Sequence, residues 1–153
     1  MGCAPGREHR VSWPHGPLGT DTINARGLAR DVAEAVDGLL FPAIPVTCCP
    51  GYSVGYRGTL AVDRSVTAAY LEEIIEAAVR NDTRKLVVII AHGGAVEVVH
   101  EVGRRIGRRH ADLVLVGATW WRTLPAGFGA SIGFTQRDGG GHGGPRETAV
   151  AMW

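Results

Sequence analysis

The chain is 153 residues long, is 45% hydrophobic and 20% charged, and carries a formal net charge of +1, which is typical of one globular domain with a substantial core. The near-neutral charge excludes bulk attraction to nucleic acid or to an anionic membrane, and no apolar run approaches the roughly 20 residues of a membrane span. Three cysteines are too few for a disulfide framework, and the N-terminus lacks the apolar stretch of a signal peptide, so we expect a cytoplasmic protein.

The N-terminal part of the chain contains one clear helical pattern. Residues 1–20 are rich in Gly, Pro and His and are expected to form a loop. A helix follows, with Asp21 or Thr22 as its N-cap and with an apolar stripe formed by Ile23, Leu28, Val32 and Val36. Residues 39–49 are apolar but interrupted by prolines, so this segment and residues 59–62 are expected to be short strands at most.

A helix and a strand are expected over residues 63–91. Asp63 can cap the helix, which ends near Asn81 and has an apolar face formed by Val66, Tyr70, Ile74 and Ala77. Residues 85–91 then form a continuous, mostly β-branched run that is too short for a helix. Such a run is typical of a parallel strand that is buried on both faces.

The alternation of helix and strand continues to the C-terminus. The next helix places Ala95, Val99, Val102 and Ile106 inward, and its Glu101 and Arg105 can pair at i,i+4. Residues 112–117 predict a second strand, residues 125–145 are Gly-rich and irregular, and residues 147–153 begin a last helix. This order predicts an α/β domain with a largely parallel sheet.

Three Gly-rich or Pro-rich turns carry histidine, alone or with a carboxylate. They are residues 15–21, 92–94 and 142–148. His92 follows directly after the strand expected at residues 85–91, and ligands collect at the carboxyl ends of the strands in parallel sheets. Because imidazole and carboxylate suit Zn, Mn or Fe, the three turns together predict a metal pocket built from strand ends.

Each of these residues also has a simpler explanation. His92 can be an ordinary turn residue, and its Gly-rich loop could bind phosphate at the following helix N-terminus, although no complete phosphate motif is present. An N-cap is the more common role for an Asp placed like Asp21. Glu147 can be a first-turn residue that the helix dipole favours. His142 lies among glycines that offer it little packing, which favours a functional role over a core role.

Two adjacent tryptophans, Trp120 and Trp121, follow the second strand. Tryptophan in such a place more often belongs to the core than to a pocket. One of two adjacent residues that leave a strand nevertheless tends to face the cleft. There an indole makes a good wall for a flat or cationic substrate.

Taken in order, five motifs resemble those of the creatininase family of metal-dependent amidohydrolases. The family signature that ends in Leu-Gly-Thr-Asp is similar to residues 12–21, and its Gly-x-x-Gly-Thr segment is similar to residues 55–59. The remaining three are an Asn-Gly-His-Gly-Gly-Asn turn, a Trp-Trp pair and a closing His-Ala-Gly-x-x-Glu-Thr, which resemble residues 90–95, 120–121 and 142–148. Any one match is weak, but the ordered set covers nearly the whole chain.

The resemblance implies a single creatininase-like domain over residues 1–153 with a three-layer α/β/α fold. It implies hydrolysis of a C–N amide-type bond in a small molecule: a cyclic amide, a formamide or a short peptide. It implies one or two divalent ions, Zn foremost, with Mn or Fe as alternatives. It also implies a homo-oligomer, often a hexamer in the family, and no nucleic-acid or membrane partner is expected.

Carried over residue by residue, the resemblance assigns roles to the three turns. His15, Asp21, His92 and Glu147 are the implied metal ligands, and Asp21 is the carboxylate that can bridge two ions. His142 and Glu147 are the implied catalytic residues. Trp120 and Trp121 are expected to contact the substrate.

The sequence departs from the family pattern at the first motif. Three residues are missing there, so His15 matches either the first or the second family histidine. Trp13 and Pro14, or Arg10, stand where the family has a metal-binding Glu, and residues 1–11 do not encode the apolar strand that precedes the motif in the family. Losing one ligand weakens a metal site severely. A catalytically inactive creatininase-like domain that binds a partner or subunit therefore stays open as an alternative, and a phosphate- or nucleotide-binding domain ranks last.

Overall fold

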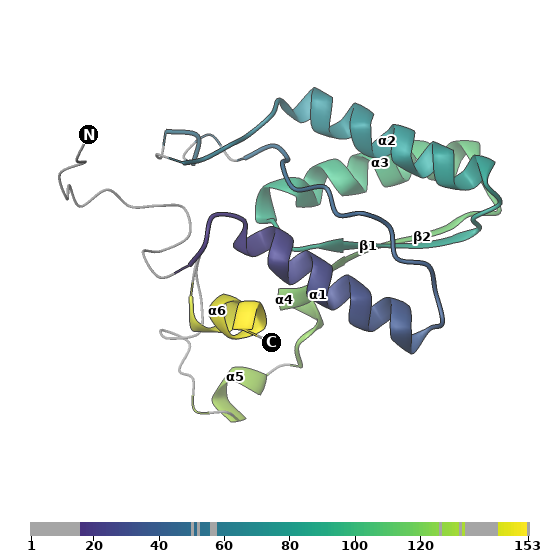
Figure 1. The fold of residues 1–153 in the computed structure, drawn as a ribbon. Helices are drawn as coiled ribbons and strands as arrows, with labels where there is room; N and C mark the ends of the chain where they lie inside the picture. Colours follow the sequence, from purple (N-terminus) through teal and green to yellow (C-terminus); the bar gives the residue numbers. More distant parts are fainter. Residues whose placement is uncertain are drawn as a thin grey trace.

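The structure is a computed structural model that describes residues 16–49, 51, 53–55, 58–125, 127–131, 133 and 144–152. Its elements in chain order are α1 (Thr20–Ala35), α2 (Arg64–Arg80), β1 (Lys85–Ile90), the 3-10 turn η1 (Gly93–Ala95), α3 (Val96–Arg109), β2 (Val114–Thr119), α4 (Trp120–Thr123), α5 (Phe128–Ser131) and α6 (Pro145–Met152). Figure 1 shows α2 and α3 on one side of the strands and α1 on the other. The expected α/β fold is therefore confirmed. Among the described helices, none is long and apolar enough to cross a membrane.

The two strands pair in parallel, as the sequence predicts. The register runs from Lys85 opposite Val114 to Ile90 opposite Thr119, and the sheet has two strands within the described residues. Ile90 belongs to the buried core, against which Leu86, Val88 and Leu115 pack. Val87 points to the other face and is 47% exposed. The expectation of burial on both faces is thus wrong for the described chain, because α2 and α3 cover one face while α1 covers only part of the other.

Helix α2 begins where the sequence predicts but buries a different face. The Asp63 carboxylate caps it by accepting a hydrogen bond from the Ser65 N–H at 2.7 Å. The buried residues are Thr67, Ala68, Leu71, Ile75, Ala78 and Val79, whereas Tyr70 is 56% exposed and Val66 is also exposed. Apolar residues occur on more than one side of this helix. The periodicity of the sequence therefore predicts the stripe that contains Val66 and Tyr70, which is wrong. The observed stripe packs against α3.

Helix α3 matches its prediction closely. Its buried residues, together with Ala95 just before it, are Val98, Val99, Val102 and Ile106. The expected pair of Glu101 and Arg105 forms at 3.1 Å, and Arg105 also pairs with Glu72 of α2 at 2.8 Å. Of these two pairs only Arg105–Glu72 joins the two helices, and each of these partly exposed ion pairs contributes little to stability. The apolar contact beneath them carries the packing.

Helix α1 begins earlier than predicted and exposes its predicted apolar stripe. Its N-cap is Gly19, whose φ of 102° lies in the left-handed region that favours glycine, and no side chain caps the helix. Neither Asp21 nor Thr22 is therefore the N-cap. The buried residues of α1 are Thr20 and Asn24, while Ile23, Val32 and Val36 are exposed. Because Asp21 does not cap the helix, its carboxylate can bind a partner outside α1.

The two segments expected to be short strands at most form none. Residues 38–49 and 59–62 have no regular secondary structure. The Val62 N–H donates to the Thr47 carbonyl at 3.3 Å, and the Cys48 N–H donates to Thr67 Oγ1 at 2.9 Å. These bonds tie the segment to the start of α2. They bring Cys48 and Cys49 to the end of β1 where His92 lies, as the contacts described below show.

Candidate functional site

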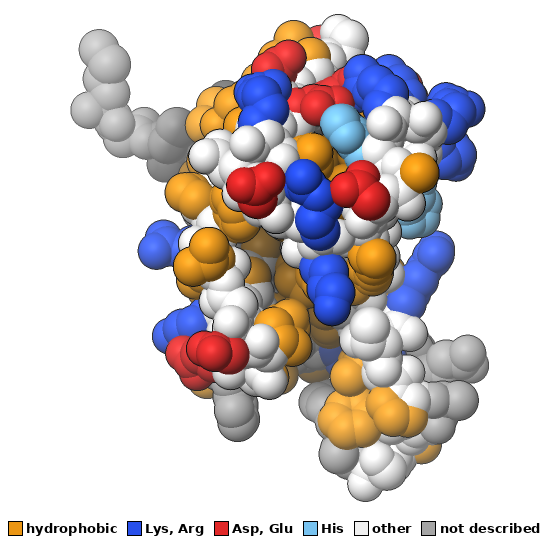
Figure 2. Space-filling view, turned by 90° about the vertical axis from the view of Figure 1, so that its right-hand side faces the viewer, with side chains coloured by type: hydrophobic (Ala, Val, Ile, Leu, Met, Phe, Trp, Pro, Cys, Tyr) orange, Lys and Arg blue, Asp and Glu red, His pale blue; other side chains and the backbone are white. Residues whose placement is uncertain are grey.

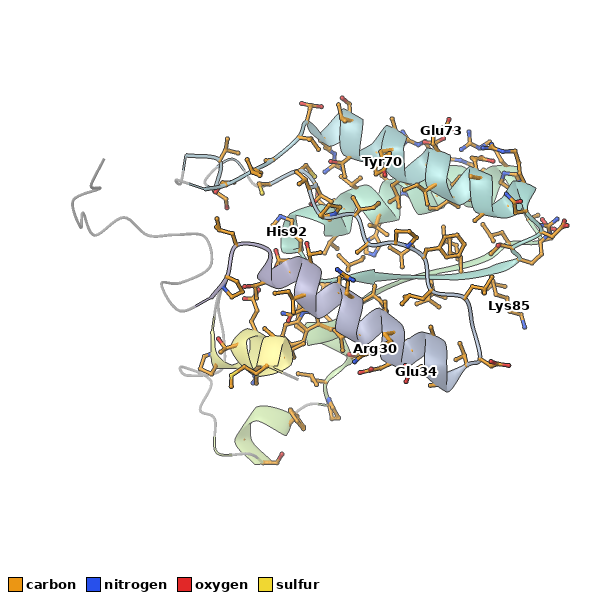
Figure 3. The ribbon with its side chains drawn as sticks, in the orientation of Figure 1. Arg30, Glu34, Tyr70, Glu73, Lys85 and His92 are labelled. Atoms are coloured by element: carbon orange, nitrogen blue, oxygen red, sulfur yellow. The ribbon has the colours of Figure 1, made fainter. Side chains whose placement is uncertain are left out.

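The centre of the candidate site is a contact between Asp21 and His92. His92 lies just beyond β1 in extended backbone and precedes η1, while Asp21 lies in the first turn of α1. The His92 Nδ1–H donates to Asp21 Oδ2 at 2.9 Å. The side chains are partly buried, 16% exposed for His92 and 30% for Asp21. Figure 3 shows His92 at the end of the sheet that adjoins the N-terminus of α1.

Local structure explains why the Asp21 carboxylate is available to His92. Because Gly19 starts the helix, Asp21 is a first-turn residue whose charge is favoured by the helix dipole. Burial at the end of β1 limits the solvent around His92. The pair therefore combines an acceptor at a helix N-terminus with a donor at a strand end. This is the carboxyl-end location that the sequence predicts for the site.

The electrostatics of the site favour a positively charged His92 ring. The hydrogen bond to Asp21 raises the pKa of His92 above its ordinary value, and this effect outweighs burial, which lowers it. The Asp21 charge, the Cys48 carbonyl and the Glu147 charge raise the pKa of His92 further. A metal ion must therefore compete with a proton for this imidazole.

Sequence reasoning missed one side chain that contacts His92, Cys49. Its Sγ lies 3.7 Å from His92 Nε2, the ring nitrogen opposite the one that bonds Asp21. Burial, and then the charges of Cys48 and Asp21, raise the pKa of the Cys49 thiol. Burial and neighbouring negative charge thus oppose formation of the Cys49 thiolate, whereas a cysteine nucleophile is activated by surroundings that lower its pKa. The only sequence signal was that Cys49 ends an apolar segment, as His92 does.

Glu147 lies in the same neighbourhood, on α6. Asn24 of α1 is 1% exposed, and its Nδ2 donates to the Glu147 backbone carbonyl at 3.4 Å. The Glu147 charge also acts on the pKa of His92. The structure therefore brings Asp21 and His92 into contact and places Glu147 near enough for its charge to act on His92. His15 and His142 lie outside the described residues, and the metal and catalytic roles of all five residues stay predictions.

Trp120 and Trp121 begin α4, directly after β2. Because Ile90 lies opposite Thr119, the tryptophans leave the same edge of the sheet as His92. Their rings meet edge to face, with centroids 5.8 Å apart. Trp120 Nε1 is buried and has no hydrogen-bond partner among the described residues. Their contact with a substrate stays a prediction.

The donors suit a divalent ion, but the described part of the chain does not complete a shell. Carboxylate oxygen, imidazole nitrogen and thiol sulfur are all ligands of zinc. Within the described residues, no group of three or more His, Cys, Asp and Glu side chains could hold a metal ion. Oxygen and nitrogen ligands of one tetrahedral zinc lie about 3.4 Å apart, so the 2.9 Å contact of Asp21 and His92 is a hydrogen bond. A carboxylate in this position orients a metal-binding imidazole.

The fold and this site define an α/β protein whose polar site lies at the carboxyl ends of parallel strands. The sequence matches the model of the Creatininase family, described as creatinine amidohydrolase, over residues 14–153. The chain therefore belongs to the creatininase family. No curated protein matches it.

Solved structures with a similar fold are creatininases. The structure of a creatinine amidohydrolase is similar with a TM-score of 0.77 at 22% identity, and the match covers 92% of this chain and 60% of that one. A creatininase with Mn has a TM-score of 0.74 at 22% identity, covering 94% and 60% of the two chains. A mutant creatininase of Zn–Zn type has a TM-score of 0.71 at 23% identity, covering 92% and 60%. The chain thus spans about three fifths of these neighbours.

Proposed function

We propose that this protein is a metal-dependent amidohydrolase that cleaves a C–N bond in a small amide. The observation that carries the proposal is the hydrogen bond between Asp21 and His92 at the carboxyl end of the sheet, in a domain of this family. The names of the structural neighbours support it, since they include an Mn form, a Zn–Zn form and a mutant complexed with creatine. The substrate class is a cyclic amide, a formamide or a short peptide.

Each residue has a defined part in this proposal. Asp21 and His92 are two of the proposed metal ligands, and the hydrogen bond between them fixes the orientation of the imidazole at the end of β1. When bound, a divalent ion supplies Lewis acidity that polarises a carbonyl and activates water. Glu147 or His142 moves a proton to the leaving nitrogen. Trp120 and Trp121 form a wall for the substrate, and His15 and Glu147 are further candidate ligands.

A second candidate function is an inactive domain of this family that binds a partner or subunit. It is favoured by the incomplete ligand set, because the described residues hold no group of three metal-binding side chains. This candidate and the hydrolase differ in what they predict for metal content.

Metal analysis and an amidase assay on the purified chain test the proposal together. We expect about one tight Zn or Mn per chain and slow hydrolysis of an amide such as creatinine or an N-formyl compound. A chelator should remove the activity, and the metal should restore it. A folded protein that retains no tight metal and hydrolyses none of these amides would instead support the binding domain.

We extend the proposal to a cytoplasmic homo-oligomer. Several large apolar side chains are exposed on the described chain, among them Leu39, Leu60, Leu18 and Val36. In Figure 2 hydrophobic side chains lie open between charged ones on the face drawn. Extended apolar exposure marks interaction surfaces. Light scattering on the protein as it elutes from a size-exclusion column should therefore give a mass several times that of one chain. A monomer at micromolar concentration would contradict the proposed homo-oligomer.

A further inference from the structure

A shallow groove of about 300 Å³ lies between helix α3 and strand β2. Its lining residues are Val99, His100, Gly103 and Arg104 of α3 and Leu115 and Gly117 of β2. None of them belongs to the candidate site at the end of β1. The groove is therefore a separate feature of the surface.

Two glycines keep this groove open. A Cβ atom on Gly103 would lie 3.6 Å from Leu115 Cδ2, in ordinary van der Waals contact, so a larger side chain there would extend into the groove. A Cβ atom on Gly117 would lie 3.2 Å from Val99 Cγ1, which is a tight contact. Glycine inside a helix or strand weakens it, but it also lets another backbone approach closely.

The edge of the sheet beside the groove offers backbone groups for pairing. The Val114 N–H donates to the Arg84 carbonyl at 2.8 Å, which fixes the direction of the Val114 backbone groups toward β1. Because this direction alternates along a strand, the N–H and C=O groups of Leu115 and Gly117 point away from β1. Within the described residues the sheet has no strand on that side. Strand β2 also contains no charge or proline that would hinder another strand from pairing with it.

The charged side chains that line the groove are basic. They are His100 and Arg104, and no carboxylate is among the lining residues. Neither side chain forms a hydrogen bond or an ion pair within the part of the chain that the structure describes. Pairing of β2 with its own copy, about a two-fold axis perpendicular to the sheet, would place two basic grooves on the same face. Charge complementarity therefore favours an acidic partner over a second copy.

We propose that the groove and the open edge of β2 together bind an extended polypeptide segment that carries an acidic side chain. The segment pairs with the backbone of Leu115 and Gly117 as an added strand, and its acidic side chain lies in the groove beside Arg104. This mode of binding uses the edge, the groove and the charge, whereas a small anion would use the charge alone. The inference goes beyond the proposed function and holds whether or not the chain hydrolyses an amide.

Fluorescence polarisation with labelled peptides tests the role of charge. The probe is the peptide Ser-Val-Glu-Val-Leu-Val-Ser, and its matched partner has Lys in place of Glu. We expect the parent protein to bind the Glu peptide roughly 10-fold more tightly than the Lys peptide. Arg104→Glu should reverse this preference, whereas Arg108→Glu makes the same charge change on α3 outside the groove and should retain it. Failure of the parent to bind the Glu peptide, or an unchanged preference in Arg104→Glu, would overturn the proposal.

N-methylation of the Glu peptide tests whether it pairs as a strand. One version carries methyl groups on the amides of Glu and Leu, and the other carries them on the amides of the valines. Because only alternate amides of an added strand face β2, one version should lose binding and the other should retain it. Equal binding of the two versions would contradict strand pairing.

Filling the groove tests its occupant. Gly103→Leu should abolish binding of the Glu peptide, while Gly27→Leu on α1, where a Cβ atom also meets nothing within 4 Å, should not. Circular dichroism checks that both variants fold. Should Gly103→Leu alone reduce the mass measured by light scattering, a second copy of the chain would occupy the edge, and the acidic segment would be the wrong partner.

Discussion

The Asp21 carboxylate and the His92 imidazole are hydrogen-bonded at 2.9 Å although 71 positions separate them in the sequence. The bond joins the first turn of α1 to the end of β1. One turn further along α1, Asn24 donates to the Glu147 carbonyl of α6. Helix α1 therefore connects the two predicted site segments, the turn after β1 that carries His92 and helix α6 that carries Glu147. Substitutions of Asp21 should affect the site more than the core.

Asp21→Asn should weaken metal binding while leaving the fold intact. The amide keeps the shape and one acceptor but loses the charge that helps to orient His92 and raise its pKa. We expect metal affinity to fall about 10–100-fold, as for other lost partners of metal-binding histidines. Calorimetric titration with Zn²⁺ measures the affinity.

Asp31→Asn is the matched control for this change. Asp31 lies on the same helix but pairs with exposed Arg30 at 3.6 Å. Its substitution should leave metal affinity unchanged. Equal affinities in the two variants would mean that the Asp21 charge does not act on the site.

His92→Ala should abolish tight metal binding with little effect on folding. The residue lies in the turn after β1 rather than within the strand, and its side chain makes polar contacts to Asp21 and Cys49. Removing it therefore leaves the apolar core unchanged. Metal content and the circular dichroism spectrum measure the two effects.

His100→Ala is the control for His92→Ala, because His100 is exposed on α3. It should retain full metal content. If His92→Ala binds Zn²⁺ as tightly as the parent, His92 is an ordinary turn residue.

The stability of the metal-free protein should decrease as pH rises above 6.5. The folded pKa of His92 is raised above that ordinary value, so between the unfolded and folded pKa the native state binds more protons. The stabilisation from protonated His92 is complete below the unfolded pKa and is lost as pH rises through the folded pKa. Urea unfolding in the presence of a chelator, repeated across this range, measures the effect.

His92→Gln should lack this part of the pH dependence, since glutamine does not titrate. A parent and a His92→Gln variant with the same pH profile would show that another group is responsible.

Sequence patterns correctly predict the elements whose apolar residues are buried within the domain. The inward residues of α3, Val99, Val102 and Ile106, are buried as expected, and the run at 85–91 forms β1. The patterns failed where a helix is apolar on more than one side. In α2 the choice between two stripes depends on how α3 packs against it, which periodicity does not contain.

Only the residues of the candidate site that lie in recognisable sequence motifs could be predicted. The two turns that carry Asp21 and His92 were identified as parts of one site, and the structure brings these two residues together. Cys49 was not found, because its position depends on the irregular path of residues 38–49 and on their hydrogen bonds to the start of α2. That path has no periodic signal in the sequence.

The choice of buried face on α2 gives the last prediction. Ile75 is 1% exposed and lies in the core cluster, while Tyr70 is largely exposed on the same helix. Ile75→Ala should lower the free energy of unfolding by about 2–5 kcal/mol, because it removes buried methyl groups and leaves a cavity. Tyr70→Ala should change the free energy of unfolding by less than about 1 kcal/mol, because substitutions of exposed residues usually have small effects on stability. Urea unfolding of both variants at one pH and protein concentration measures the difference. Should Tyr70→Ala prove the more damaging, the stripe of Val66, Tyr70 and Ile74 would be the buried one, either in the domain or at a contact between copies of the chain, and a concentration dependence of the unfolding midpoint would distinguish the two.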